Sequence, residues 1–266
     1  MSAHKAKKHF GQHFLHDAHV IDRILRALDA QPEEHLVEIG PGLGALTAPL
    51  IARVPKLTVV ELDRDVLPPL RAALGSHLPK LTLIEADALS VDYRTLAPPG
   101  GKLRLIGNLP YNISTALLFH LLEQTEVVHD MHFMLQKEVV DRMCAQPDDN
   151  HYGRLTVTLA ARAQCQNLFA VGPESFNPPP KVHSAIVRVT PRAAEFPMPD
   201  LAAFDRLVAV AFAQRRKTLS NSLKTLLDAN AIRAAGVDPQ ARAETLSPAA
   251  FGRLTEVWLQ REAASG

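Results

Sequence analysis

The chain has 266 residues, which is enough for one sizeable α/β domain and a small second one. Hydrophobic residues make up 47% of it and charged residues 21%, a balance that excludes a disordered chain. The formal net charge is only +1, so total charge does not predict nucleic-acid binding, and any basic surface must come from local clustering.

Short apolar segments alternate with helix-like segments along most of the chain. Strands are expected at 36–39, 57–62 and 81–84, with helices between them at 47–53 and 66–74. This alternation predicts βαβαβ units and an α/β fold with a parallel sheet. The elements expected after these are strands at 103–106, 131–135, 155–161 and 184–189, and helices at 115–122 and 137–143.

The pattern of residues changes after residue 189. Three prolines interrupt a polar stretch there, and the rest of the chain has helix-like patterns. Helices are expected at 201–213, 217–228 and 248–259. We therefore expect a domain of residues 1–195 and a small all-helical domain of residues 196–266. The alternative is a proline-rich loop inside one domain.

A glycine-rich turn follows the first predicted strand and reads Gly40-Pro41-Gly42-Leu43-Gly44. Glycine lets the backbone approach a ligand closely, although such turns also serve dinucleotides or purely structural purposes. Pro41 has no N–H, which fits a nucleoside cofactor without a pyrophosphate at least as well as a dinucleotide.

Two acidic residues follow the next two strands. Glu61 stands where a carboxylate can accept hydrogen bonds from ribose hydroxyls, and Asp87 where one can bind the amino group of a cofactor's adenine. The alternatives are a surface carboxylate for Glu61 and a helix N-cap for Asp87.

The fourth strand leads into Gly107-Asn108-Leu109-Pro110-Tyr111-Asn112. This combination of residues would suit an enzyme that methylates the amino nitrogen of adenine. That nitrogen is a poor nucleophile because its lone pair is delocalised into the ring, so the enzyme must hold it with the lone pair turned toward an electrophilic methyl group. The Asn108 side-chain oxygen and the Leu109 carbonyl could accept both amino hydrogens, Pro110 would fix the turn, and Tyr111 could stack on the base. The alternative is an ordinary tight turn in which Asn108 caps and Tyr111 packs.

These motifs, taken together, resemble those of the ribosomal RNA adenine dimethyltransferase family, and the resemblance covers nearly the whole chain. The matching segments are 10–15 (FGQHFL), 37–42 (VEIGPG), 61–63 (ELD), 107–114 (GNLPYNIS), 135–139 (LQKEV) and 176–182 (FNPPPKV). The resemblance implies a Rossmann-like class I methyltransferase sheet with a small C-terminal helical RNA-binding domain. It also implies that S-adenosylmethionine is used to dimethylate two adjacent adenines near the 3′ end of small-subunit (16S) ribosomal RNA, during subunit assembly.

The resemblance also assigns site residues by position. Those implied to bind the cofactor are His13, Leu15, Gly40, Gly42, Glu61, Asp87, Ala88 and Asn108. Phe176 is implied to be a second stacking partner for the target adenine, opposite Tyr111. The family often has asparagine at position 13, and a side-chain contact made by His13 could become sensitive to pH.

Basic residues cluster in the predicted helical domain, where no acidic residue lies between Arg206 and Leu227. Those expected to contact RNA phosphates are Arg215, Arg216, Lys217 and Lys224, with Lys5, Lys7 and Lys8 as a second basic segment. The alternative for such a run is a solvated helix face.

Several other features are expected to be absent. His9, His13, His16 and His19 have no accompanying cysteine, and Cys144 and Cys165 lack ligand-like spacing, so neither a metal site nor a disulfide framework is expected. No apolar run is long enough for a signal peptide or a membrane span. We expect a cytoplasmic protein, acting as a monomer on the immature small subunit.

Three other functions compete with this one. An erythromycin-resistance-type enzyme modifies large-subunit RNA with similar motifs, but Leu109 stands where that group tends to have isoleucine. A non-catalytic assembly or transcription factor of the same fold would not need Asn108, Pro110 and Tyr111 intact. A methyltransferase acting on small molecules or proteins would not need a basic helical face.

Overall fold

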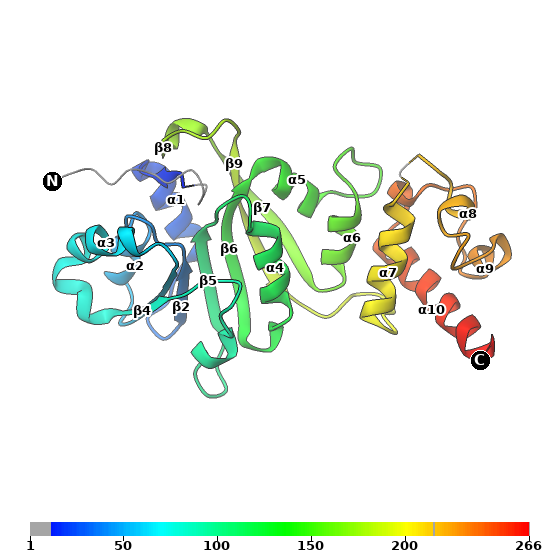
Figure 1. Ribbon diagram of the computed structural model, residues 1–266, viewed down its shortest axis with the longest axis horizontal. Coiled ribbons are helices and arrows are strands. Elements are labelled where there is room, and N and C mark those ends of the chain that lie inside the picture. The colour runs from blue at the N-terminus through cyan, green and yellow to red at the C-terminus, as the bar shows by residue number, and fades with distance from the viewer. Residues whose placement is uncertain (1–11, 215, 266) are drawn as a thin grey trace. The chain divides into compact units, whose positions relative to one another are not determined.

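The computed structural model describes residues 12–214 and 216–265. The chain divides into two compact units, one of residues 1–140 with 166–191 and one of residues 141–165 with 192–266 (Figure 1). The last boundary therefore lies after Pro191 rather than after residue 195. Residues 141–165 belong to the second unit because their apolar side chains, such as Tyr152 and Val157, lie in its core.

A seven-stranded sheet is the centre of the first unit, with the strand order β4-β3-β2-β5-β6-β9-β7. The first five of these are parallel, and β9 runs antiparallel to β6. The strands are β2 (His35–Ile39), β3 (Leu57–Glu61), β4 (Leu81–Glu85), β5 (Leu103–Asn108), β6 (Val128–Gln136), β7 (Ala163–Val171) and β9 (Ser184–Pro191). The chain order reverses between β2 and β5, so a ligand crevice is expected at the carboxyl ends of these two strands.

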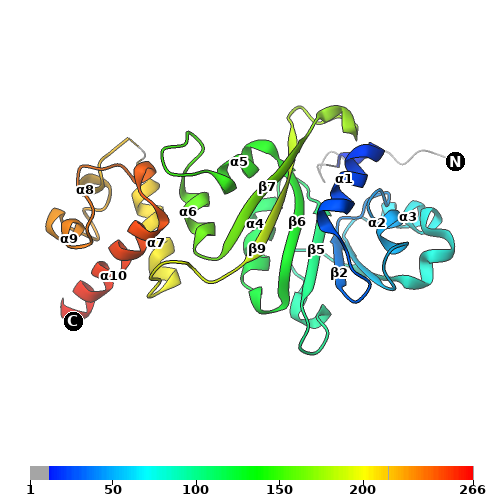
Figure 2. The ribbon, with the colours of Figure 1, turned by 180° about the vertical axis from the view of Figure 1, so that it is seen from behind.

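Helices cover both faces of this sheet. Figures 1 and 2 show α1 (Ala18–Leu28) over one face and α4 (Ser114–Leu122) over the other. Asp17 begins α1 as its N-cap, because its carboxylate accepts hydrogen bonds from two backbone N–H groups of the first turn. The other helices of this part are α2 (Thr47–Ile51), α3 (Leu67–Leu74) and α5 (Lys137–Cys144), with 3₁₀ turns at Arg64–Val66, Gly75–Lys80, Tyr93–Leu96, Thr125–Val127 and Pro173–Ser175.

The second unit is helical and has its own core. Phe204, Phe251 and Leu254 are fully buried in it, and the Tyr152 hydroxyl donates to the Leu246 carbonyl at 2.6 Å. Its helices are α6 (Arg154–Ala160), α7 (Leu201–Phe212), α8 (Leu219–Ser222), α9 (Ala229–Ala234) and α10 (Pro248–Ser265), with a 3₁₀ turn at Ala243–Thr245.

Two of the expected elements are wrong. Residues 155–161, expected as a strand, form α6; nearly every residue there is buried, so the run lacks the alternation that separates strand from helix. The Thr156 hydroxyl, which accepts from Gly153 N–H at 3.2 Å, helps to begin this helix. The helix expected at 217–228 is limited to the short α8, since Asp228 instead caps the start of α9 by accepting from Ala231 N–H at 2.8 Å.

A buried ion pair ties α1 to the middle of the sheet. Arg104 on β5 donates Nε and Nη2 to the two carboxylate oxygens of Asp130 on β6, at 2.8 and 2.9 Å. Nη2 also donates to the Leu28 carbonyl at the end of α1, at 2.7 Å. Burial alone would raise the pKa of Asp130, but the hydrogen bonds from Arg104 outweigh it and hold that pKa below its ordinary value.

We expect Asp130→Ala to lower the free energy of unfolding by about 3 kcal/mol, because it leaves the buried Arg104 guanidinium with only the partly exposed Glu34 carboxylate as its counterion. Urea unfolding measures this. The matched control is Asp22→Ala, which removes a solvent-exposed partner of Arg26 and should cost less than about 1 kcal/mol. Equal losses in the two variants would contradict the role given to the buried pair.

Candidate active site

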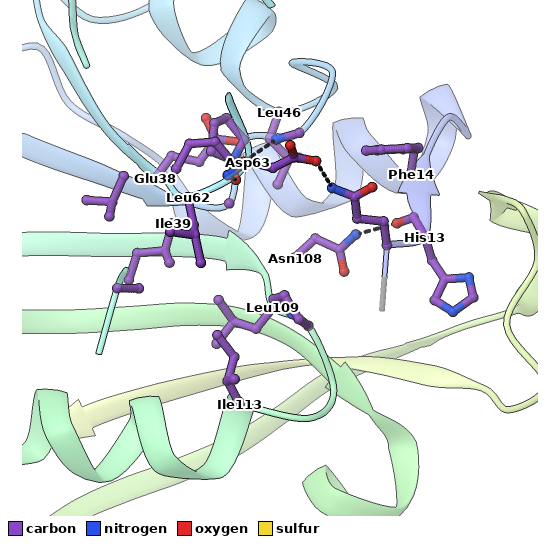
Figure 3. A pocket seen from close by; sticks show the side chains of 18 of the residues that line it. His13, Phe14, Glu38, Ile39, Leu46, Leu62, Asp63, Asn108, Leu109 and Ile113 are labelled. Atoms are coloured by element: carbon purple, nitrogen blue, oxygen red, sulfur yellow. Dashed lines mark hydrogen bonds between the residues drawn. The ribbon is translucent and has the colours of Figure 1, made fainter. Parts of the chain in front are cut away.

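A cavity of about 360 Å³ opens at the carboxyl ends of β2 and β5, where the strand order reverses. Figure 3 shows side chains from segments far apart in the sequence converging around it. Its size is that of a small-molecule site. The sequence-predicted cofactor residues all lie in its lining: His13, Leu15, Gly40, Gly42, Glu61, Asp87, Ala88 and Asn108.

The glycine loop after β2 has the left-handed backbone that glycine favours. Gly40 has φ +68° and Gly42 has φ +52°. A Cβ on Gly42 would lie 3.1 Å from the Phe14 ring, so the loop and the N-terminal segment are packed closely together. The Gly40 N–H donates to the Val60 carbonyl at 2.9 Å, which holds the loop against the end of β3.

Two carboxylates stand at the ends of neighbouring strands. Glu61 accepts from Asp63 N–H at 2.8 Å and from Gly42 N–H at 3.4 Å. Burial raises the pKa of Glu61, and these backbone hydrogen bonds oppose the rise. Asp87 is exposed and accepts from Leu89 N–H at 3.0 Å; it closes a turn and is not a helix N-cap.

The loop after β5 is anchored to the N-terminal segment. Asn108 Nδ2 donates to the His13 carbonyl at 2.9 Å (Figure 3). With its amide nitrogen bound there, Asn108 keeps Oδ1 as a hydrogen-bond acceptor. Tyr111 shares a hydrogen bond of 2.8 Å with the buried hydroxyl of Ser184, and burial raises the pKa of the Tyr111 phenol.

Sequence reasoning gave no role to several residues of the cavity lining, among them Gln12, Leu62 and Asp63. Gln12 Nε2 donates to Asp63 Oδ2 at 2.7 Å, and Asp63 is only 4% exposed. Leu62, by contrast, is 52% exposed and offers an apolar surface at the cavity. The one signal in the sequence for Leu62 and Asp63 was their position at the end of a predicted strand. The hydrogen bond of Asp63 could not be predicted, because its partner Gln12 lies 51 residues away.

Phe176 lies apart from this lining. It is 3% exposed and packs in the core of the first unit, paired with Leu15 where β8 (Phe176–Asn177) runs antiparallel to β1 (Phe14–Leu15). Its contact with the target adenine stays a prediction.

The expected RNA-binding residues belong to the second unit. Arg216, Lys217 and Lys224 are exposed, and they lie in turns around α8 rather than along a long helical face. Arg215 falls outside the described residues, as do Lys5, Lys7, Lys8 and His9. Within residues 12–214 and 216–265 no group of three potential metal-ligating side chains occurs, and no helix there is long and apolar enough to cross a bilayer.

Glu38 is a buried carboxyl group of the cavity lining. It is 1% exposed, and its Oε2 has no hydrogen-bond partner in the part of the chain that the structure describes. Burial raises its pKa to about 8, the nearby Thr47 hydroxyl opposes this rise, and the charge of Glu61 adds to it.

This raised pKa predicts a pH-dependent stability. Between the ordinary pKa of 4.5 and about 8, the folded protein keeps Glu38 protonated while the unfolded chain loses the proton, so stability falls as pH rises through this range. Glu38→Gln removes this linkage, and its stability relative to the wild type should therefore increase from about pH 5 to about pH 8, by on the order of a few kcal/mol.

Urea unfolding at several pH values, with the exposed Glu33→Gln as a control, measures the difference. The same pH dependence in the wild type and in Glu38→Gln would contradict the assignment.

The chain matches the family model described as "Ribosomal RNA adenine dimethylase" over residues 3–260. It is 52% identical over 254 residues to the ribosomal RNA small subunit methyltransferase A of Pseudomonas putida, covering 95% of both chains. It is 53% identical over 253 residues to the protein of the same name in Pseudomonas aeruginosa, covering 94% of each. Among solved structures it resembles the 23S rRNA methyltransferase ErmE, with a TM-score of 0.74, 27% identity, and coverage of 93% of this chain and 100% of that one.

These matches confirm the resemblance that the motifs indicated and the α/β methyltransferase fold. The chain belongs to the ribosomal RNA adenine dimethylase family.

Proposed function

We propose that the chain transfers methyl groups from S-adenosylmethionine to the N6 amino groups of two adjacent adenines near the 3′ end of small-subunit ribosomal RNA, during assembly of that subunit. The observation that carries this proposal is the position of Asn108, which borders the cofactor cavity and leads directly into Tyr111. Relatives more than 50% identical are named for the small subunit, whereas the large-subunit enzyme ErmE is only 27% identical. The resistance-type alternative is therefore less well supported.

The cavity suits a nucleoside cofactor. Glu61 stands where it can accept hydrogen bonds from ribose hydroxyls, and Asp87 where it can accept one from the adenine amino group, next to the backbone of Ala88. Leu62 offers an apolar surface for the adenine ring, and the glycine loop allows the methionine part to approach the backbone. When bound, this cofactor supplies an electrophilic methyl group on a sulfonium sulfur.

The loop after β5 would orient the second substrate. Asn108 Oδ1 and the Leu109 carbonyl would accept the two amino hydrogens of the target adenine, so that the nitrogen lone pair turns toward the methyl group. Pro110 shapes this turn, and Tyr111 stacks on the base. A strong general base is unnecessary, because the nitrogen loses its proton readily once it has become cationic, and the chemistry needs no metal ion.

The substrate is expected to be an unpaired or extruded base, since the adenine amino group is otherwise engaged in pairing. The exposed Arg216, Lys217 and Lys224, together with Arg215, would contact RNA phosphates from the second unit.

We expect Asn108→Ala to lower kcat/KM for methyl transfer by about 10²–10³-fold, because one acceptor that acts in the transition state is lost. Labelled S-adenosylmethionine is incubated with undermethylated small and large ribosomal subunits, and the modified nucleosides are identified by mass spectrometry. Asn167→Ala, an exposed asparagine on β7 outside the cavity lining, is the control and should retain activity.

Dimethyladenosine confined to the small subunit supports the proposal. Label in the large subunit would instead indicate a resistance-type enzyme. An absence of transfer by a wild-type protein that binds the cofactor would indicate a non-catalytic assembly factor.

We expect Gly42→Ala to weaken S-adenosylmethionine binding by about 10-fold or more, because the added Cβ meets the Phe14 ring and strains a left-handed residue. Calorimetric titration measures the affinity. Gly100→Ala is matched in backbone strain, with φ +71°, but its Cβ enters open space; it should lose stability and keep cofactor affinity. Equal affinities in the two variants would argue against a cofactor at this loop.

A further inference from the structure

The segment after β4 lines the cavity with Ala86, Asp87 and Ala88. At its start, the Ala86 N–H donates to the Glu61 carbonyl at the end of β3, at 3.1 Å. The Asp87 carbonyl accepts from the N–H and the hydroxyl of Ser90, each at 2.8 Å, which closes a tight turn. The position of Asp87 and Ala88 therefore depends on what holds the chain after this turn.

Side chains at the end of α4 hold the chain there. His120 Nε2 lies 2.8 Å from the Val91 carbonyl, and since a carbonyl oxygen only accepts, Nε2 carries the proton of this bond. Gln124, which follows α4 and is buried, accepts from the Tyr93 N–H with its Oε1 at 2.8 Å. The Gln124 amide in turn donates to the His120 carbonyl at 3.3 Å. These contacts fix the backbone of residues 91–93 against the helix.

Tyr93 connects this anchor to the cavity wall. Its side chain is fully buried, and its hydroxyl donates to the Ala88 carbonyl at 3.2 Å. Its ring meets the His120 ring edge-on, with the centroids 6.0 Å apart and the planes inclined by 64°. Burial raises the pKa of the Tyr93 phenol, and the charge of Asp87 adds to the rise, so the hydroxyl keeps its proton and remains a donor. A continuous set of contacts thus runs from α4 to a residue of the cavity lining.

We propose that Tyr93 and His120 are positioning residues for recognition of the cofactor's adenine. Neither of them lines the cavity; they act through Ala88 and Asp87, whose backbone N–H and carboxylate would bind the edge of the base. Adenine offers an amino group and a bare ring nitrogen at this edge. Hypoxanthine offers a carbonyl and a ring N–H, which meet the same two groups with the wrong polarity. This inference rests on the proposed function and deepens it, since it identifies what gives the cofactor site its preference for adenine.

Conservative substitutions separate these hydrogen bonds from the packing around them. Tyr93→Phe removes only the hydroxyl, His120→Ala removes the donor to the Val91 carbonyl, and His120→Gln keeps an N–H donor near the place of Nε2. The matched control is Tyr152→Phe, which removes a similarly buried hydroxyl that donates to the Leu246 carbonyl in the second unit.

Two ligands and one stability measurement are needed for each variant. Calorimetric displacement titrations give the affinity for S-adenosylhomocysteine and for S-inosylhomocysteine, in which a carbonyl replaces the amino group of the base. Thermal unfolding gives the stability, and methyl transfer gives kcat and KM for S-adenosylmethionine.

We expect Tyr93→Phe and His120→Ala to weaken S-adenosylhomocysteine binding about 3- to 10-fold, as for loss of one hydrogen bond, and to change S-inosylhomocysteine binding less than about twofold. The preference for adenine should fall accordingly, and His120→Gln should restore it. KM for the cofactor should rise while kcat stays within about twofold of the wild type. Tyr152→Phe should lose stability and keep both affinities.

Equal losses for the two ligands in Tyr93→Phe, or the same loss in Tyr152→Phe, would reduce these contacts to support of the fold and overturn the positioning role. Unchanged affinities in both Tyr93→Phe and His120→Ala overturn it as well. A wild type that binds S-adenosylhomocysteine without preferring it to S-inosylhomocysteine removes the adenine recognition that the inference requires. If the wild type binds neither ligand, the proposed function itself fails.

Discussion

The close approach of β2 and β5 at their carboxyl ends is the constraint on which the site depends. A Cβ on Gly107 would lie 2.5 Å from the Ile39 carbonyl oxygen, so only glycine fits at this point of β5. The two strands therefore deliver their loops side by side, and the position of a Cβ on Gly40 is 3.8 Å from the Asn108 carbonyl oxygen. Under the proposed function, these backbone contacts set the distance between the cofactor and the target base, which must be short for a direct transfer.

Several carboxyl groups line the cavity near the carboxyl ends of β2 and β5, and they differ in how deeply they are buried. Glu38 is buried in the cavity lining with a raised pKa, Glu61 accepts from backbone N–H groups, and Asp63 accepts from Gln12. A sulfonium cofactor carries positive charge, and fixed acceptors in a site of low polarity favour such a cation more than water-exposed ones would. The N-terminal segment that lines the cavity is held by two hydrogen bonds: Gln12 donates to the Asp63 carboxylate, and Asn108 donates to the His13 carbonyl.

Local patterns in the sequence predicted every strand of the sheet except β7, because these strands are short apolar segments, and predicted the loops after β2 and β5 from their glycine, proline and asparagine residues. The strand predicted at residues 155–161 was wrong, because a short buried run with several β-branched residues has no hydrophobic periodicity that distinguishes a helix from a strand. The short pairing of β1 with β8 and the stacking of His13 on Tyr111 join segments 98 or more residues apart, which no window of sequence can reveal. The glycines and acids were predictable from position, whereas their hydrogen-bond partners were not.

The pairing of β1 with β8 has a consequence for biosynthesis. The segment at residues 12–15 leaves the ribosome early, yet its partners at residues 176–178, and the Ser184 that holds Tyr111, are synthesised more than 150 residues later. Long-range pairing of this kind forms only after the entropy of closing a long loop has been overcome. A nascent chain that already contains the glycine loop and Asn108 therefore still lacks the partners of residues 13–15 and of Tyr111, which are present only when β8 and β9 have been synthesised.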